Sequence, residues 1–118
     1  AKGAAMTILK LRILFDGAML GPGKAELLAR IRETGSISAA GRSMGMSYKR
    51  AWSLVEEMNA AFRAPLVESA RGGAGGGGAL VTQSGLAVVD AYRGFEAASM
   101  RAGAGALATL QAMLRDPP

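Results

Sequence analysis

Two glycines and two serines, alternating in the middle of the chain, limit the possible folds more than any other feature of the sequence. Gly35 follows a segment, residues 24–34, whose apolar residues recur at helical spacing, and a glycine there ends a helix in the left-handed conformation. Ser36 is a preferred N-cap for a second helix, Gly45 ends that helix after a short run, and Ser47 is the N-cap for a third. Three consecutive helices are therefore predicted, at Lys24–Thr34, from Ser36 through Met44, and from Tyr48 to about Phe62.

Two short apolar segments follow the third helix and flank a loop that is rich in glycine. Leu66–Ser69 and Ala79–Thr82 have the length and residue types of strands, and Arg71 stands at the base of the loop between them. A helix, a short helix, a turn with a glycine, a third helix and a β-hairpin follow one another in a winged helix-turn-helix. We therefore predict a mainly α fold with a small β component, in which the glycine-rich loop is the wing. A nucleotide-binding loop is not expected, because such a loop follows a buried strand and ends in Gly-Lys-Ser or Gly-Lys-Thr.

The N-terminal part of the chain combines a short tail with an alternating segment. Residues 1–5 have no pattern, and we expect a disordered tail there. From Thr7 to Phe15 the sequence alternates, which predicts a half-buried strand with Lys10 and Arg12 on its solvated face. The side chains expected on the buried face are Leu9, Leu11, Ile13 and Phe15. Turns are predicted at residues 16–17 and 21–23, where glycine and proline gather.

The C-terminal part of the chain is predicted to be helical, beginning at a cap formed by Thr82 or Ser84. From Leu86 to Phe95 this helix is apolar around most of its surface, and Gly103 is expected to interrupt it, as is Gly105. A face left over after packing on the domain indicates a dimer partner. We therefore divide the chain into a winged helix-turn-helix unit, residues 6–82, and a dimerisation helix, residues 83–115.

The third helix is expected to present one apolar face and one polar face. At 100° per residue, its apolar residues fall within about 60° of one another and form the buried stripe. These residues are Ala51, Val55, Met58 and Phe62, while Lys49, Arg50 and Ser53 lie on the opposite side. We expect Trp52 to be a core residue, and the Tyr48 ring to pack at the edge of the stripe or to bring its hydroxyl to a phosphate.

The charges around the start of this helix have one sign. No acidic residue occurs between Thr34 and Val55, whereas Arg42, Lys49 and Arg50 are all basic. The first turn of a recognition helix is the part that reaches base edges in the major groove of DNA, and Arg42 is placed to reach a phosphate. This pattern predicts a DNA-binding surface.

The composition of the whole chain agrees with a polyanionic partner and argues against catalysis. Fourteen Lys and Arg against nine Asp and Glu give a net charge of +5, which favours nucleic acid or an acidic membrane surface. The absence of Cys and His excludes disulfides, thiolate and imidazole metal sites, and catalysis by a nucleophile with an imidazole base. The carboxylates are dispersed, so we expect no enzyme activity, no cofactor and no metal. We also expect no membrane span and a cytoplasmic location.

Several stretches together resemble the N-terminal DNA-binding domain of the ModE family of molybdate-responsive regulators, whose fold is related to the LysR-type winged helix. The matching stretches are Leu9-Lys-Leu, Gly35-Ser-Ile-Ser, Gly45-Met-Ser-Tyr-Lys-Arg-Ala-Trp52, Glu57-Met-Asn59, Leu66-Val-Glu, Gly72-Gly-Ala-Gly-Gly-Gly-Gly78 and Leu80-Val-Thr-Gln-Ser-Gly85. The resemblance covers roughly residues 7–100. It implies a homodimer that binds a palindromic operator.

In that family, molybdate is bound by C-terminal β-barrel domains, and none of the matching stretches belongs to such a domain. The resemblance therefore does not lead us to expect molybdate binding within these 118 residues. Two alternatives stay open, a stand-alone version of the domain or a segment of a longer protein.

The leading hypothesis is a sequence-specific regulator of transcription that binds double-stranded DNA as a homodimer. The predicted DNA-binding residues are Ser36, Ser38, Arg42, Ser47, Tyr48, Lys49, Arg50, Ser53 and Arg71. The alternative is a winged-helix module that binds a protein partner and has no specific affinity for DNA. The charges favour the first hypothesis, because Lys49 and Arg50 fit poorly in the charge-depleted centre of a protein interface.

Overall fold

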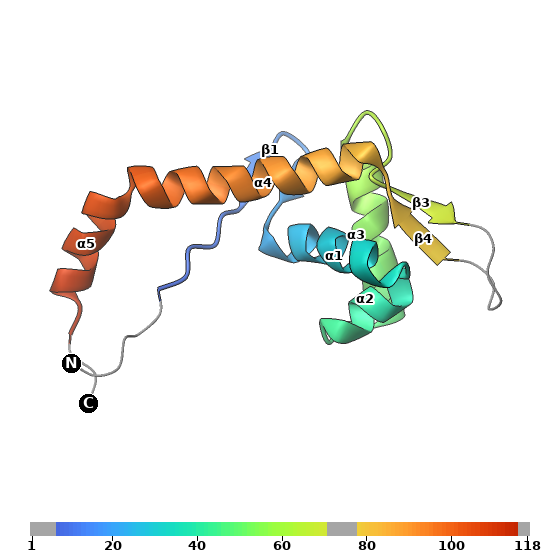
Figure 1. Cartoon of the computed structure of the whole chain (residues 1–118), viewed down its shortest axis with the longest axis horizontal. Coiled ribbons are helices and arrows are strands. Elements are labelled where there is room, and N and C mark those ends of the chain that lie inside the picture. The colour runs from blue at the N-terminus through green and yellow to red at the C-terminus, as the bar shows by residue number, and fades with distance from the viewer. Residues whose placement is uncertain (1–6, 71–77, 116–118) are drawn as a thin grey trace.

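The computed structural model describes residues 7–70 and 78–115, and in this part the chain is mostly helical with two small antiparallel sheets. The elements are β1 (Ile13–Phe15), β2 (Ala18–Leu20), α1 (Pro22–Thr34), α2 (Ile37–Ser43), α3 (Tyr48–Ala61), β3 (Val67–Ala70), β4 (Gly78–Val81), α4 (Gln83–Ala102) and α5 (Ala104–Met113). Helices α1 to α3 and the β3–β4 hairpin form one packed unit, and α4 runs across it and extends well beyond it to α5 (Figure 1). The prediction of a winged helix-turn-helix is confirmed.

The helix ends lie where the glycines and serines predicted them. Gly35 has φ 69° and donates its backbone N–H to the carbonyl of Ile31, which closes α1. The Ser36 hydroxyl accepts the N–H of Ala39 at 3.0 Å, and Gly45 turns the chain after α2 with φ 74°. Each contact is local, so neighbouring residues alone are enough to place these ends.

The same capping chemistry starts the remaining long helices. Ser47 Oγ accepts the N–H of Arg50 at 3.0 Å, and Thr82 Oγ1 accepts the N–H of Gly85 at 3.0 Å. Of the two caps predicted for α4, Thr82 is therefore the one that forms. The α1 helix begins at Pro22, two residues before the predicted start, because proline is well accommodated in the first turn of a helix.

The core lies between α1, α3, the wing and the first half of α4. Its most deeply buried large side chains are Leu27, Leu28, Ile31, Val55, Met58 and Leu66. The predicted buried stripe of α3 is confirmed for Ala51, Val55 and Met58, and Phe62 packs against the core while partly exposed. Leu54 is also buried, although the helical wheel did not single it out.

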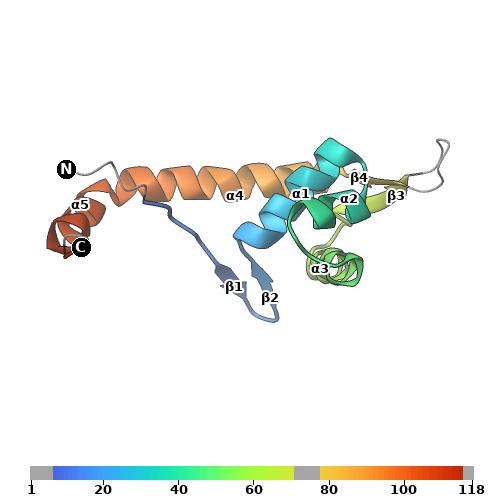
Figure 2. The same ribbon diagram turned by 90° about the horizontal axis from the view of Figure 1, so that it is seen from below.

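The predicted strand from Thr7 to Phe15 is wrong in its length. Only its last three residues form a strand, β1, and they pair with β2, which had not been predicted. Gly17, with φ 87°, reverses the chain as predicted, but the turn predicted at residues 21–23 is wrong, because α1 already begins at Pro22. This early helix start limits β2 to three residues, so in the described part of the chain β2 pairs only with residues 13–15. The expected buried face also fails at both ends, because Leu9 and Phe15 are exposed. Figure 2 shows the β1–β2 hairpin projecting away from α4.

The residues before β1 form an extended segment that is fastened to α4. The Tyr92 hydroxyl donates to the carbonyl of Leu11 at 2.6 Å. Burial, followed by the neighbouring carboxylate of Glu96, raises the pKa of the Tyr92 phenol, so the donating form predominates at neutral pH. At the other end of this segment, the Gln111 amide donates to the Thr7 hydroxyl at 2.9 Å.

The C-terminal helix is interrupted once rather than twice. Gly103 separates α4 from α5, whereas Gly105 lies inside α5. The wing strands are each displaced by one residue from the prediction, with Val67 opposite Val81 and Ala70 opposite Gly78. Within the described ranges, no helix combines the length and the apolar character that a bilayer crossing requires.

Candidate nucleic-acid interface

The start of α3 is an exposed cationic surface. Lys49 and Arg50 lie in its first turn with exposed side chains, while Ala51, the next residue, is fully buried. Within residues 7–70 and 78–115, neither cation takes part in an ion pair. The capping bond from Ser47 fixes the first turn, so both cations project from a rigid element.

Helix α2 places further polar residues of the predicted set beside α3. Arg42 is exposed near its C-terminal end, and one guanidinium nitrogen donates to the Ser38 hydroxyl at 3.0 Å. The oxygen of Ser36 is engaged as the N-cap of the same helix. These three residues from the predicted set therefore lie along one short helix, where Ser36 and Ser38 are half-buried.

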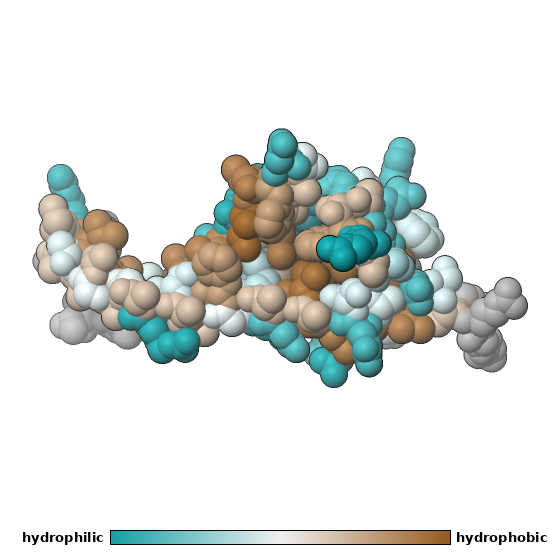
Figure 3. Space-filling view, turned by 90° about the horizontal axis from the view of Figure 1, so that it is seen from above, coloured by the Kyte–Doolittle hydropathy of each residue, from teal (hydrophilic) through white to brown (hydrophobic). Residues whose placement is uncertain are grey.

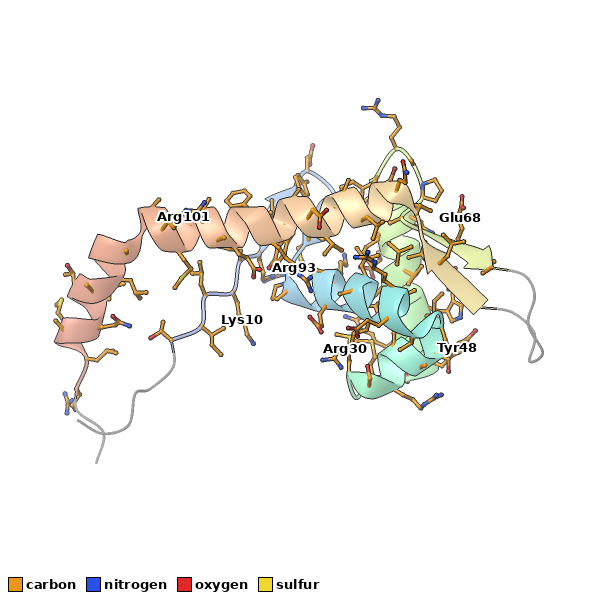
Figure 4. The ribbon with its side chains drawn as sticks, viewed as in Figure 1. Lys10, Arg30, Tyr48, Glu68, Arg93 and Arg101 are labelled. Atoms are coloured by element: carbon orange, nitrogen blue, oxygen red, sulfur yellow. The ribbon has the colours of Figure 1, made fainter. Side chains whose placement is uncertain are left out.

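A glycine allows α2 and α3 to approach closely, and an arginine of α1 holds the C-terminal end of α2. A Cβ atom on Gly41 would lie 2.8 Å from the Ala51 methyl group, so the two helices approach more closely than a side chain at this position allows. Arg30 of α1 donates to the Ser43 carbonyl at 2.7 Å and binds Glu26 at 2.8 Å, which holds the end of α2 (Figure 4). Sequence reasoning missed Arg30, because only its pairing with Glu26 has a local signature.

The wing is joined to the helix-turn-helix by backbone and side-chain hydrogen bonds. The Ala79 N–H of β4 donates to the carbonyl of Gly35 at 2.9 Å. Asn59 of α3 accepts the N–H groups of Leu66 and Val67 at 2.8 and 3.2 Å and donates to the Val67 carbonyl at 3.0 Å. Arg71, predicted at the base of the wing, lies outside the described residues.

A hollow of about 350 Å³ lies between α2, α3 and the wing, and it brings together residues that are far apart in sequence. Ser36, Ser38 and Tyr48 of the predicted set line it, together with Trp52 and Ser69. The Tyr48 ring is 58% exposed and meets the Trp52 ring edge-on, with centroids 6.1 Å apart. Trp52 packs against the core, as predicted.

The predicted DNA-binding residues differ in the solvent exposure of their side chains. Ser53 is half-buried on α3, whereas Ser47, Lys49 and Arg50 are exposed. Glu68 is exposed on β3, and in the view of Figure 4 it lies on the opposite side of the wing from Tyr48. The side of the molecule that carries Tyr48 is therefore not the side on which this carboxylate projects.

A buried lysine pairs with a carboxylate of α3 that lies two turns beyond Arg50. Lys24 of α1 is only 7% exposed, and its ammonium group lies 3.0 Å from the Glu57 carboxylate and 3.0 Å from the Met19 carbonyl. The half-exposed carboxylate of Glu57 is thus paired with a buried cation of the same chain. In the described part of the chain, Asp and Glu side chains nowhere gather in threes that could hold a metal ion.

The order and packing of these elements match one protein family over most of the unit just described. The family described as bacterial regulatory helix-turn-helix protein, lysR family, matches residues 23–86, more than half of the chain. The chain belongs to this family. The match begins in the first turn of α1 and ends in the first turn of α4, so it contains the helix-turn-helix and the wing.

Individual relatives support the resemblance to ModE proteins. The molybdenum-pterin-binding protein MopB of Rhodobacter capsulatus is 49% identical over 81 residues, which are 69% of this chain and 30% of that protein. The DNA-binding transcriptional dual regulator ModE of Escherichia coli K12 is 44% identical over 71 residues, 60% of this chain and 27% of that protein. The chain spans less than a third of the length of these relatives. This lysR-family domain is therefore similar to the N-terminal region of ModE-type regulators, and the family is one of regulators rather than enzymes.

Proposed function

We propose that this lysR-family domain binds double-stranded DNA through the start of α3 and acts as the DNA-binding unit of a transcriptional regulator. The observation that carries the proposal is the pair of exposed cations, Lys49 and Arg50, opposite the buried face of a capped helix. No carboxylate occurs in the sequence between Thr34 and Val55, so this surface is not repelled by phosphates.

The side chains at this surface suit two kinds of DNA contact. Arginine binds the guanine edge through two parallel hydrogen bonds and lysine binds the same acceptors, so we assign base contacts to Arg50 and Lys49. The hydroxyl groups and Arg42 suit backbone contacts, which fix the orientation of a protein on the duplex. We assign this role to Ser36, Ser38, Arg42, Ser47, Tyr48 and Ser53, and a groove or phosphate contact to Arg71 of the wing.

The proposal includes a homodimer on a palindromic site. Large apolar side chains are exposed on the β1–β2 hairpin, where Leu14 is 71% exposed, and along α4 and α5, where Phe95 is 54% exposed and Leu110 is 62% exposed. Figure 3 draws hydrophobic residues together on this side of the molecule, over the hairpin and beside α4. Apolar faces of this kind favour a second copy of the chain as partner. In this proposal the unit formed by residues 6–82 binds DNA, residues 83–115 form the dimer, and the exposed side chains of the hairpin add to the apolar surface of the dimer.

The relatives support a role in the regulation of transcription, but their names alone do not assign a ligand to this chain. The Escherichia coli relative is named as a DNA-binding transcriptional dual regulator, and the Rhodobacter capsulatus relative is named for binding molybdenum-pterin. The chain corresponds to less than a third of either protein. We therefore extend DNA binding to this chain, on the strength of its own cationic helix, and we do not extend the molybdenum-containing ligand.

Selection from a random duplex library, at two salt concentrations, tests the DNA-binding proposal. We expect an enriched palindrome bound with a Kd on the order of 10⁻⁸ M and with steep salt dependence. Lys49→Ala and Arg50→Ala should each weaken binding to the selected site by about 10-fold or more, corresponding to roughly 1–3 kcal/mol for a bidentate base contact. Arg63→Ala removes an exposed charge from beyond the other end of α3 and serves as the matched control.

Two outcomes would contradict this proposal. If Lys49→Ala and Arg50→Ala both bind the selected site as tightly as the parent, α3 is not the recognition element. Weak binding with no sequence preference in the parent would favour a protein-interaction module. Light scattering at micromolar concentration tests the dimer separately, with Phe95→Glu expected to shift the parent dimer to a monomer, and a strictly monomeric parent would remove the two-half-site arrangement.

A further inference from the structure

A second cationic surface adjoins the start of α3. A groove of about 430 Å³ lies between the extended N-terminal segment, the start of α1 and one side of α3. Four cationic side chains line it, from Lys10, Arg12, Lys24 and Arg50, against one carboxylate, from Glu57. Arg50 therefore belongs both to this groove and to the cationic start of α3.

The single carboxylate in the groove is already paired. Lys24, which is nearly buried, lies 3.0 Å from the Glu57 carboxylate, so these two charges compensate each other. Lys10, Arg12 and Arg50 remain, and all three are exposed. None of the three takes part in an ion pair in the described part of the chain, so the groove presents uncompensated positive charge.

The N-terminal segment is held in place rather than loosely attached. The Leu11 carbonyl accepts the Tyr92 hydroxyl at 2.6 Å, and the Leu11 side chain packs beside Tyr92 and Leu20. Because successive side chains of an extended chain point to opposite sides, the anchoring of Leu11 on α4 turns its two neighbours, Lys10 and Arg12, toward the groove. In Figure 4, Lys10 and Tyr48 both lie on the side of the molecule away from α4.

We propose that Lys10 and Arg12 of this groove bind phosphate groups of the DNA backbone next to the base pairs that α3 contacts, with Arg50 at the border between the two surfaces. The inference rests on the proposed function and adds a flanking contact to it. Ammonium and guanidinium groups are suitable donors to phosphate, and a cation shared with α3 places the bound phosphates on the same duplex. From the sequence, a solvated strand face was preferred to a second DNA site for Lys10 and Arg12, but no strand forms at these residues.

The test compares Lys10→Gln, Arg12→Gln and the double variant with the parent, using the whole chain. Affinity is measured by fluorescence anisotropy for the selected duplex and for a random duplex over a range of KCl concentrations. Each lost phosphate contact should reduce the magnitude of the negative slope of log K against log salt by about 0.9. Both duplexes should lose affinity by a similar factor, because phosphate contacts carry no sequence information.

The matched control removes the same number of charges elsewhere. Arg32→Gln with Arg63→Gln neutralises two exposed arginines that do not line the groove, and its slope should equal that of the parent. A duplex shortened to the selected base pairs should abolish the difference between the parent and the double variant. Thermal unfolding in the presence of inorganic phosphate tests whether the groove binds the free anion instead of the DNA backbone.

The outcomes separate this inference from the proposed function. If the double variant keeps the parental salt slope while the parent prefers the selected site, the groove assignment is wrong and the function of α3 stands. If the parent shows neither preference nor salt dependence, both are wrong. A phosphate-dependent rise in the Tm of the parent, absent in the double variant and combined with an unchanged DNA slope, would indicate a free-anion site and overturn the inference.

Discussion

Replacement of Asn59 by alanine should separate the wing from α3 and lower the stability of the whole domain. The Asn59 amide accepts two backbone N–H groups, from Leu66 and Val67, and donates to the Val67 carbonyl. Leu66 is fully buried and Val67 nearly so, so water cannot easily replace the lost partners. A hydrogen bond contributes about 1 kcal/mol and an unsatisfied buried group costs about 1–3 kcal/mol. For three bonds we expect a loss of about 3 kcal/mol.

The Asn59→Asp variant gives an internal scale for this estimate. A carboxylate at residue 59 keeps both acceptor bonds and strengthens them, but it replaces the donation to the Val67 carbonyl by repulsion between two oxygens. We therefore expect a smaller loss of about 1–2 kcal/mol. Urea unfolding, followed by the fluorescence of Trp52, the only tryptophan, measures both variants. The Tm of Asn59→Ala should fall by about 12 °C, from roughly 4 °C per kcal/mol in a domain of this size. A loss below about 0.5 kcal/mol in Asn59→Ala, or equal losses in both variants, would refute the reasoning.

Three further predictions concern other contacts. Gly41→Ala should lower the free energy of unfolding by about 1–3 kcal/mol in urea, because its new methyl group meets α3 at 2.8 Å, whereas Gly94→Ala, in open space, should not destabilise. Lys24→Met should cost about 1–2 kcal/mol by leaving the half-exposed Glu57 carboxylate unpaired, and a double-mutant cycle with Glu57→Gln should recover part of this loss. Tyr92→Phe should cost about 1 kcal/mol at neutral pH. Because the pKa of Tyr92 is raised, this contribution is complete below pH 10.0 and disappears as pH rises through the folded-state pKa, which unfolding at several pH values would detect.

Much of the helix-turn-helix could be predicted because the residues that set its helix ends act on near neighbours in the sequence. The caps at Ser36, Ser47 and Thr82 each act on a backbone N–H three residues ahead, and the left-handed glycines act at their own residue. The buried stripe of α3 follows from helical periodicity in the same way. Local signals of this kind place most helix ends within a residue or two, and they place Lys49 and Arg50 in the exposed first turn.

The predictions failed for features that depend on contacts with residues distant in the sequence. The alternation from Thr7 to Phe15 suits a strand, but a strand also needs a neighbouring backbone to pair with, and the chain supplies only three residues of β2. The roles of Arg30 and Lys24 were missed for a related reason. Arg30 has a partner 13 residues away, at Ser43, and Lys24 pairs with Glu57 on another helix.

The order of the first three helices and the wing strands, most helix ends and the sign of the charge at the start of α3 were determined by the sequence alone. These features depend on a residue and its near neighbours, whose separation is set by the covalent chain. Only the tertiary structure decided which charges remain uncompensated. A contact such as that of Tyr92 with Leu11 spans 81 residues and turns Lys10 and Arg12 toward the groove, while Lys24 neutralises Glu57 beside them. No short-range pattern encodes these pairings, because they exist only once the helices have packed.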